Sequence, residues 1–233
     1  MMPTSEQLDA LFKAGALKRL GMGSRRACYA IPGTDLCVKC YRSEEEIVEG
    51  KYPGHSPVLP LAPAVVHEIR KYRFDRHHNT CCQECRYWQT LREVLPADLM
   101  AFFPETLEEV CVPSRGWGIV ESRIDNADGS PVRRFHEIWF RSSGEERCRL
   151  ADAFAVLVDG LAQYAVRFFD PQNILVQRCA DGTFRLRIMD FEPTTRTLIA
   201  LDRLSPMFVR FKVRRRFARY RKKLGIKGGG PHV

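Results

Sequence analysis

An asparagine and an aspartate stand at the two ends of a predicted β-hairpin in the second half of the sequence. Asn173 precedes an apolar run, Asp190 lies near the end of the strand-like segment 184–191, and the turn residues Ala-Asp-Gly occupy 180–182 between them. Because a hairpin brings its two ends together, both side chains are expected to face one place. Carboxylate and amide oxygens are ligands that Mg²⁺ prefers. Asn173 and Asp190 are therefore predicted metal ligands.

A glycine-containing segment near the N-terminus has the spacing of a loop that covers a nucleotide. Residues 21–28 read Gly-Met-Gly-Ser-Arg-Arg-Ala-Cys, within a predicted hairpin. Gly21 and Gly23 would let the backbone approach a phosphate, because glycine has no Cβ. Arg26 stands where a third glycine is usual. This spacing is common by chance, so it counts only in combination with other features.

A lysine and a glutamate complete the set of residues that could bind a nucleotide. Lys39 lies near the end of the predicted strand 35–41, from which its side chain could reach the α- and β-phosphates. Glu84 lies in the middle of a predicted helix over about 64–94, where it could pair with Lys39. Alone, each would more simply be a surface residue. Together with the asparagine and aspartate they predict binding of ATP with Mg²⁺.

The elements that would position these residues follow from periodicity and turn residues. Apolar alternation predicts strands, 3.6-residue spacing predicts helices, and proline and glycine clusters predict loops. Their order predicts an α+β protein with two lobes, the first β-rich with one long helix and the second helical with one hairpin. The predicted elements are an N-terminal helix, a hairpin at 18–31, a strand at 35–41, a loop-rich insertion at 42–66, a helix at 64–94, a strand pair at 110–122, a loop at 123–132, a core helix at 150–166, a hairpin at 173–191, and a basic helix at 203–224 followed by a flexible tail.

Five of the predicted segments together carry a resemblance: LGMGSRRACYA, CVKCY, ECRYWQTL, GWGIVESRIDNADGSP and PQNIL. They resemble a known family of bacterial proteins, the YrbL-type PhoP regulatory network family, and through it the protein-kinase-like fold. The resemblance runs from Lys18 to Leu224, and the insertion at 43–78 departs from it. It implies a two-lobed kinase-like fold with a nucleotide cleft, an N-lobe over 17–122, and a C-lobe over 123–233.

The resemblance also implies a role for individual residues. The matching positions would contact the phosphates, hold the metal, and bind the adenine at the hinge through backbone groups. These positions are Lys39 with its partner Glu84, Gly21 and Gly23 for the phosphates, Asn173 and Asp190 for Mg²⁺, and Glu121 and Ser122 for the hinge.

The catalytic loop departs from the kinase pattern H-R-D-x-x-x-x-N, in which the aspartate accepts the substrate proton. Counting back from Asn173, Arg167 matches, but Phe168 replaces the aspartate and Val166 replaces the histidine. Asp170 lies two residues further along, a displacement of about 6–7 Å in extended chain. A proton acceptor must lie within about 3 Å, so Asp170 can act as the base only if the loop runs differently.

The missing aspartate shapes the predicted function. General base catalysis contributes roughly 10²–10⁴-fold, and phosphoryl transfer depends mainly on positioning and electrostatics. The sequence therefore predicts an ATP- and Mg²⁺-binding regulatory pseudokinase, or a slow, atypical phosphoryl or nucleotidyl transferase with Asp170 and Arg167 as catalytic candidates. No motif names its substrate, whether a protein or a small molecule.

The nine cysteines offer an alternative hypothesis, a zinc site. Cys37-x-x-Cys40 and Cys82-x-x-Cys85, with the neighbouring histidines 77 and 78, have the outward spacing of zinc ligands. However, residues three apart on a strand point to opposite faces, so Cys37 and Cys40 should not converge. Buried reduced thiols are the favoured interpretation. Because the first twenty residues lack the apolar centre of a signal peptide, and no apolar run has the length of a membrane span, a cytoplasmic location is expected.

The net charge of +9 belongs to the C-terminal segment. Residues 203–233 contain 11 Lys and Arg and no acid, which leaves 26 basic and 28 acidic residues, about −2, in the rest of the chain. This segment is predicted to form a helix whose apolar stripe packs on the second lobe while its basic face meets solvent. The stripe consists of Val209, Val213, Phe217, Tyr220 and Leu224.

The same basic segment carries an alternative function. Residues 203–227 could bind an anionic membrane surface without any enzymatic activity, at about 1 kcal/mol for each Lys or Arg near the surface. A nucleic-acid backbone is a less favoured partner, because no base-reading motif accompanies the charge.

Overall fold

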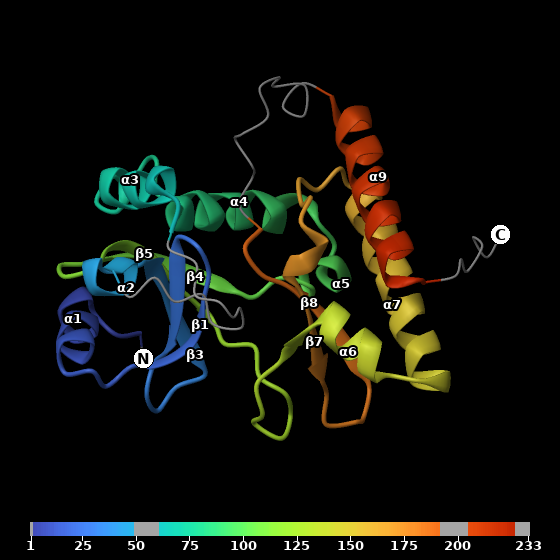
Figure 1. Ribbon diagram of the computed structural model, residues 1–233, viewed down its shortest axis with the longest axis horizontal. Helices are drawn as coiled ribbons and strands as arrows, with labels where there is room; N and C mark the ends of the chain where they lie inside the picture. Colours follow the sequence, from blue (N-terminus) through green and yellow to red (C-terminus); the bar gives the residue numbers. More distant parts are fainter. Residues whose placement is uncertain (1, 49–60, 192–204, 227–233) are drawn as a thin grey trace. The chain divides into compact units, whose positions relative to one another are not determined.

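The computed structural model describes residues 2–48, 61–191 and 205–226 and shows a mixed α+β fold. The chain divides into two compact units (Figure 1). Unit 1 comprises residues 1–88 and 105–123, and unit 2 comprises residues 89–104 and 124–233. The division at Arg123 lies one residue from the predicted lobe boundary, while residues 89–104 belong to unit 2.

Unit 1 is built on one antiparallel sheet of five strands in the order β1-β2-β3-β5-β4. The predicted first hairpin, the predicted strand after it and the predicted strand pair are all present. Gly116 turns the chain between the last two strands with φ 82°, a conformation that glycine adopts without strain. The strands are β1 (Lys18–Met22), β2 (Arg26–Ala30), β3 (Leu36–Tyr41), β4 (Thr106–Val112) and β5 (Gly116–Ser122).

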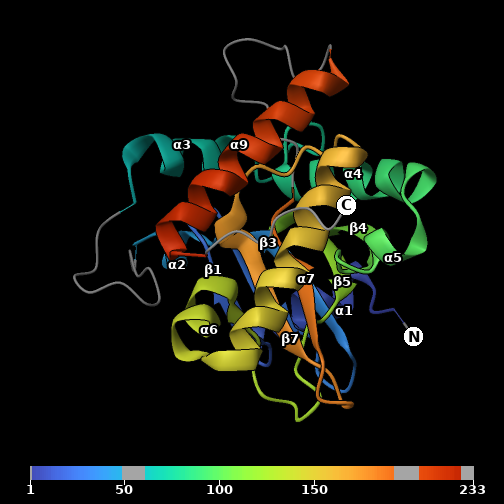
Figure 2. The same ribbon diagram turned by 90° about the vertical axis from the view of Figure 1, so that its right-hand side faces the viewer.

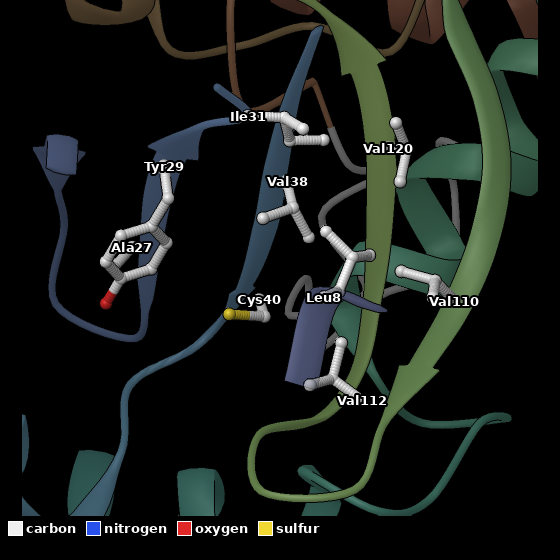
Figure 3. Packing of buried hydrophobic residues seen from close by; sticks show 9 residues of the cluster. All are labelled: Leu8, Ala27, Tyr29, Ile31, Val38, Cys40, Val110, Val112 and Val120. Atoms are coloured by element: carbon white, nitrogen blue, oxygen red, sulfur yellow. The ribbon is translucent and has the colours of Figure 1, made fainter. Parts of the chain in front are cut away.

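One face of this sheet packs against the N-terminal helix α1 (Ser5–Lys13). The helix begins with a capping box in which Thr4 and Gln7 satisfy each other's backbone N–H groups. Leu8 is fully buried against strand side chains that include Val38 and Cys40 (Figure 3). Because side chains alternate along a strand, the neighbours of these two residues point to the other face.

Asp9 on α1 gives the fold a predictable sensitivity to acid. Its carboxylate pairs with Lys13 at 2.6 Å and accepts the Ser114 N–H at 2.8 Å, and these contacts lower its pKa to about 2. An unfolded aspartate titrates near 3.9, so ionised Asp9 stabilises the fold above about pH 4, and this stabilisation is lost as the pH falls toward 2. Asp9→Asn should therefore lower the Tm at pH 6 more than at pH 2.5. Thermal unfolding at both values checks this, and a deficit of equal size at both would contradict it.

The segment between β3 and the next long helix differs from its prediction as a loop-rich insertion. Residues 44–48 form α2 (Glu44–Val48). A capping box starts it: the Ser43 N–H donates to Glu46 Oε2 at 2.8 Å, and the Glu46 N–H donates to Ser43 Oγ at 3.3 Å. The buried Glu46 carboxylate also accepts the Tyr29 hydroxyl and pairs with Arg115 at 2.7 Å. These contacts join the helix to β2 and to the β4–β5 turn. Part of the insertion, residues 49–60, lies outside the described residues.

The prediction of a single helix over 64–94 is wrong. Two helices take its place, α3 (Pro63–Tyr72) and α4 (Thr80–Val94). Between them, Asp75 accepts two backbone N–H groups, which offers the chain a turn in place of a helix. Asn79 accepts the N–H of Cys81 at 2.9 Å and donates to three carbonyl groups, so the break is held by side-chain hydrogen bonds.

Unit 2 combines a three-stranded sheet, in the order β6-β7-β8, with helices. The predicted core helix and the predicted second hairpin are both present. A short strand and two helices were not predicted, because each is too short to show a clear period. The elements are α5 (Ala97–Met100), β6 (Arg133–Arg134), α6 (Phe135–Arg141), α7 (Gly144–Gln163), the 3₁₀ turn η1 (Pro171–Asn173), β7 (Ile174–Arg178), β8 (Phe184–Ile188) and α9 (Pro206–Leu224).

The C-terminal helix α9 lies along α7 (Figures 1 and 2). The predicted apolar stripe is confirmed, since all five of its residues are buried. Phe217 contacts Phe154 of α7, with ring centroids 5.6 Å apart, and the Trp139 indole N–H donates to the Leu224 carbonyl at 2.9 Å. The basic side of the helix is left toward solvent. The predicted flexible tail after residue 226 lies outside the described residues.

Within the part of the chain that is described, the helices are all too short or too polar to cross a membrane.

Candidate functional site

The predicted pair between Lys39 and Glu84 is present in unit 1. The Lys39 ammonium donates to Glu84 Oε1 at 3.0 Å and lies 3.2 Å from Glu121 Oε1. The three side chains are almost completely enclosed, with exposed fractions of 6% for Lys39, 0% for Glu84 and 7% for Glu121. A buried charge requires partners of opposite sign. The strand lysine is therefore held in place by carboxylates from a helix and from a neighbouring strand.

Arg26 joins this cluster, although the sequence had indicated only a missing glycine there. Its guanidinium contacts Glu84 Oε2 at 2.6 Å, so each oxygen of Glu84 meets a different cation. Charge-assisted hydrogen bonds of this kind are about twice as strong as neutral ones. Glu84 thus connects β2 and β3 to α4, and this connection holds the Lys39 ammonium group close to α4.

Strand register brings the other members of the cluster to the same face. Cys28 on β2 lies opposite Lys39 on β3, and Cys37 on β3 lies opposite Glu121 on β5. This is the face opposite to the one that packs on α1. The resemblance had implied a backbone role for Glu121 at the hinge, whereas here its side chain contacts Lys39. The alternation of side-chain direction along β5 was the one sequence signal that could have placed the Glu121 side chain on the face of Lys39.

Ser122, the second predicted hinge residue, ends β5. Its N–H donates to the Glu105 carbonyl at 2.8 Å, and its hydroxyl accepts the Glu105 N–H at 2.8 Å. The N–H of Ser122 is therefore already engaged within unit 1.

The two predicted phosphate-loop glycines lie at the end of β1 and in the turn that follows. A Cβ at Gly21 would meet nothing within 4 Å, and one at Gly23 would come only within 3.8 Å of the Arg26 carbonyl. Neither residue has the positive φ that demands glycine. Packing within the fold therefore gives no reason for glycine at either position.

The predicted metal ligands lie at one end of the unit 2 hairpin. Ile174 pairs with Ile188 in the β7–β8 register, and the Met189 N–H donates to the Asn173 carbonyl at 3.0 Å. This register brings Asn173 and Asp190 to the same end of the two strands. Asp190 has φ 53°, in the left-handed region that is uncommon for residues other than glycine. Aspartate adopts this region more readily than most residues, and strained backbone of this kind clusters at active and binding sites.

The residues of the predicted catalytic loop lie in different surroundings. Phe168, in the place of the usual aspartate, is 2% exposed and packs 6.1 Å from the Phe217 ring. A charged side chain there would have to enter the aromatic core of unit 2. Asp170 is exposed, and its carboxylate accepts the Gln172 N–H at 3.2 Å, so it caps the η1 turn. Arg167 is partly buried.

The cysteines separate as strand alternation requires. Cys40 belongs to the core cluster on the α1 face, whereas the Cys37 thiol lies on the other face, 3.6 Å from the Glu121 carbonyl. A hydrogen bond with Cys28, followed by burial, raises the pKa of Cys37. Burial also raises the pKa of Cys85, to about 11. Among the described residues, the CxxC pairs and their histidines do not form a set of three ligand atoms within 4.8 Å of one another.

A hollow of about 480 Å³ lies elsewhere in unit 2, beside α6 and β7. Its lining mixes polar and apolar side chains and includes Arg133, Arg141 and Arg178. None of the predicted site residues contributes to it.

Residues 16–225 match the model of the family described as PhoP regulatory network protein YrbL. The chain belongs to the YrbL family. The match extends from β1 of unit 1 to the end of α9 in unit 2, so YrbL membership covers the Lys39 cluster and the Asn173–Asp190 hairpin alike. A comparison with curated proteins found no match for the chain.

Proposed function

We propose that this YrbL-family protein binds ATP with Mg²⁺ in a two-lobed, kinase-like fold. The observation that carries the proposal is the buried pair between Lys39 on β3 and Glu84 on α4. In phosphotransferases of the kinase type, a strand lysine paired with a helix glutamate contacts the nucleotide phosphates. A lysine that served only solubility would have no reason to be buried between two carboxylates.

The surroundings of Gly21 support the phosphate-binding part of the proposal, because among the described residues no atom lies within 4 Å of the position that a Cβ would take there. At Gly23 such a Cβ would make only an ordinary contact, 3.8 Å from the Arg26 carbonyl. Backbone at these two positions could therefore approach a phosphate. In unit 2, Asn173 and Asp190 are the residues proposed to hold Mg²⁺. Their oxygens suit a hard cation, and the hairpin register places both at one end of the strands.

The burial of Phe168 favours a regulatory nucleotide-binding protein, or a slow transferase, over an efficient kinase. The phenyl ring of Phe168 cannot accept a proton. One carboxylate oxygen of Asp170 already accepts the Gln172 N–H in the η1 turn. Losing the general base costs roughly 10²–10⁴-fold, while the charge stabilisation by lysine and metal would remain.

ATP labelled separately at its α- and γ-phosphates tests the proposal. We expect MgATP to bind, with little or no label transferred to the protein or to added acceptors. Slow transfer of the γ label would indicate a weak phosphotransferase, and transfer of the α label a nucleotidyltransferase. Absence of MgATP binding by the folded protein, measured by calorimetry, would refute the proposal.

A second candidate function is attachment to an anionic membrane surface through α9. The specific observation is that Met207 and Phe211, two large apolar residues, are 75% and 58% exposed on the same helix as the basic residues. This function ranks second, because the apolar stripe of α9 is already used for packing in unit 2. Salt-sensitive binding to anionic vesicles that survives replacement of Lys39 would favour it. The exposed basic residues are Arg210, Arg214, Arg215, Arg216, Arg219, Lys222 and Lys223.

A further inference from the structure

Three potential metal ligands converge on the sheet face that carries Lys39. The thiols of Cys28 and Cys37 and a carboxylate oxygen of Glu121 all lie within 4.8 Å of one another. Cys37 and Glu121 are buried, and Cys28 is partly exposed. Among the described residues, this is the one group of three such ligands at this spacing. We propose that Cys28, Cys37 and Glu121 form a binding site for Zn²⁺.

The spacing is close to what tetrahedral zinc requires. With Zn–S near 2.3 Å and Zn–O near 2.0–2.2 Å, the ligand atoms around zinc lie roughly 3.5–3.8 Å apart. The Cys37 sulfur is already 3.9 Å from Glu121 Oε1. The remaining contraction is small enough for side-chain rotation to supply it. Soft thiolate ligands select zinc over magnesium, so this site would be distinct from the proposed nucleotide-bound Mg²⁺.

A disulfide between the two cysteines is a poorer explanation of their proximity. Cys28 lies opposite Lys39 in the register, which makes Cys28 and Cys37 diagonal neighbours. The Cα atoms of diagonal neighbours are about 7–8 Å apart, while disulfides usually need less than about 6.8 Å. The sheet would have to deform to form the bond, whereas a metal ion between the two sulfurs requires no such change.

The charge of the cluster permits a dication. Zn²⁺ brings two positive charges, and conversion of the Cys28 and Cys37 thiols to thiolates removes two protons, so the net charge is unchanged. The contacts of Lys39 with Glu84 and Glu121 can therefore persist. A carboxylate has about four lone-pair positions, which allows Glu121 to serve both the ammonium group and the metal.

The proposed site also needs a fourth ligand and a path of entry for the metal. Three protein ligands occupy three tetrahedral positions, and the fourth remains for water or another donor, as in zinc sites that are not purely structural. Cys28 is the partly exposed member of the set, so the metal would enter from its side.

Titration of the reduced, chelator-treated full-length protein with Co²⁺ tests the site, because cobalt reports thiolate ligation by a charge-transfer band. We expect one equivalent to bind with this band and with visible bands of tetrahedral cobalt, and Zn²⁺ to displace it. Cys28→Ser should weaken Zn²⁺ binding by about 100-fold or more, since even second-shell losses cost 10–100-fold. Cys111→Ser, which alters a partly buried thiol on β4, should bind as the wild type does.

A second measurement does not depend on the folding of a variant. In the wild-type protein, Zn²⁺ should slow alkylation of Cys28 and leave that of the exposed Cys148 unchanged. Asp190→Asn should leave zinc binding intact, which separates this site from the proposed magnesium site. The inference is overturned if Co²⁺ produces no thiolate charge-transfer band, or if Cys28→Ser retains wild-type zinc affinity.

Discussion

Replacing Glu84 with alanine is expected to lower the free energy of unfolding by about 3–5 kcal/mol, because removing one partner of a buried ion pair leaves an uncompensated charge. Glu84 is fully buried, and its two oxygens contact Lys39 and Arg26 at 3.0 and 2.6 Å. Alanine would leave both cations without this carboxylate and would open a cavity between α4 and the sheet. Urea denaturation of the purified protein measures the loss.

The control is Glu93→Ala, which removes an exposed glutamate from the same helix and should change stability by no more than about 0.5 kcal/mol. A double-mutant cycle with Lys39→Met should show coupling of roughly 0.5–3 kcal/mol between the two side chains. Equal, small effects of Glu84→Ala and Glu93→Ala would show that the pair does not hold the fold together.

Lys39→Met is expected to abolish most of the stabilisation that MgATP confers on the protein. At an ATP concentration about a hundred times Kd, binding to the native state should add about 2.7 kcal/mol. Methionine keeps much of the apolar stem but lacks the ammonium group that would contact the phosphates. The quantity to measure is the increase in Tm on adding MgATP, determined separately for each variant, because loss of the buried ion pair will itself lower the Tm of the unliganded protein.

Lys18→Met is the matched control, since Lys18 is an exposed lysine in the same sheet. It should retain the full increase in Tm. Asp190→Asn should reduce the increase with MgATP and have little effect on any shift seen with ATP and chelator. If Lys39→Met responds to MgATP as strongly as Lys18→Met does, the lysine does not contact the nucleotide, and the proposed function fails at its main support.

Some missed elements had signals in the sequence. Ser43 and Glu46 have the S-x-x-E spacing of a capping box, which marks the start of α2. The prolines that follow outweighed this signal in the prediction of a loop. Asp75 and Asn79 likewise interrupt the segment predicted as one helix, and both residue types compete with helical hydrogen bonds. The prediction gave less weight to these two residues than to the helical spacing of apolar residues, which continues across the break.

Other contacts had no local signal. Arg26 reaches Glu84 across 58 residues of sequence, and Glu121 reaches Lys39 across 82. The position of Arg26 suggested only a missing glycine. Whether a strand residue contacts a helix residue depends on the strand order and on where the helix crosses the sheet. The spacing of nearby residues in the sequence determines neither.

The sequence by itself determined the strands of the first sheet, the second hairpin, the core helix and the buried stripe of α9. These depend on periods of two and 3.6 residues and on turn residues, all of which act within a few positions of the chain. Only the tertiary structure decided that Arg26 and Glu121 join the pair of Lys39 and Glu84, and that Cys28, Cys37 and Glu121 converge. Register between strands distant in sequence sets those contacts, because a shift of one residue would turn each side chain to the opposite face.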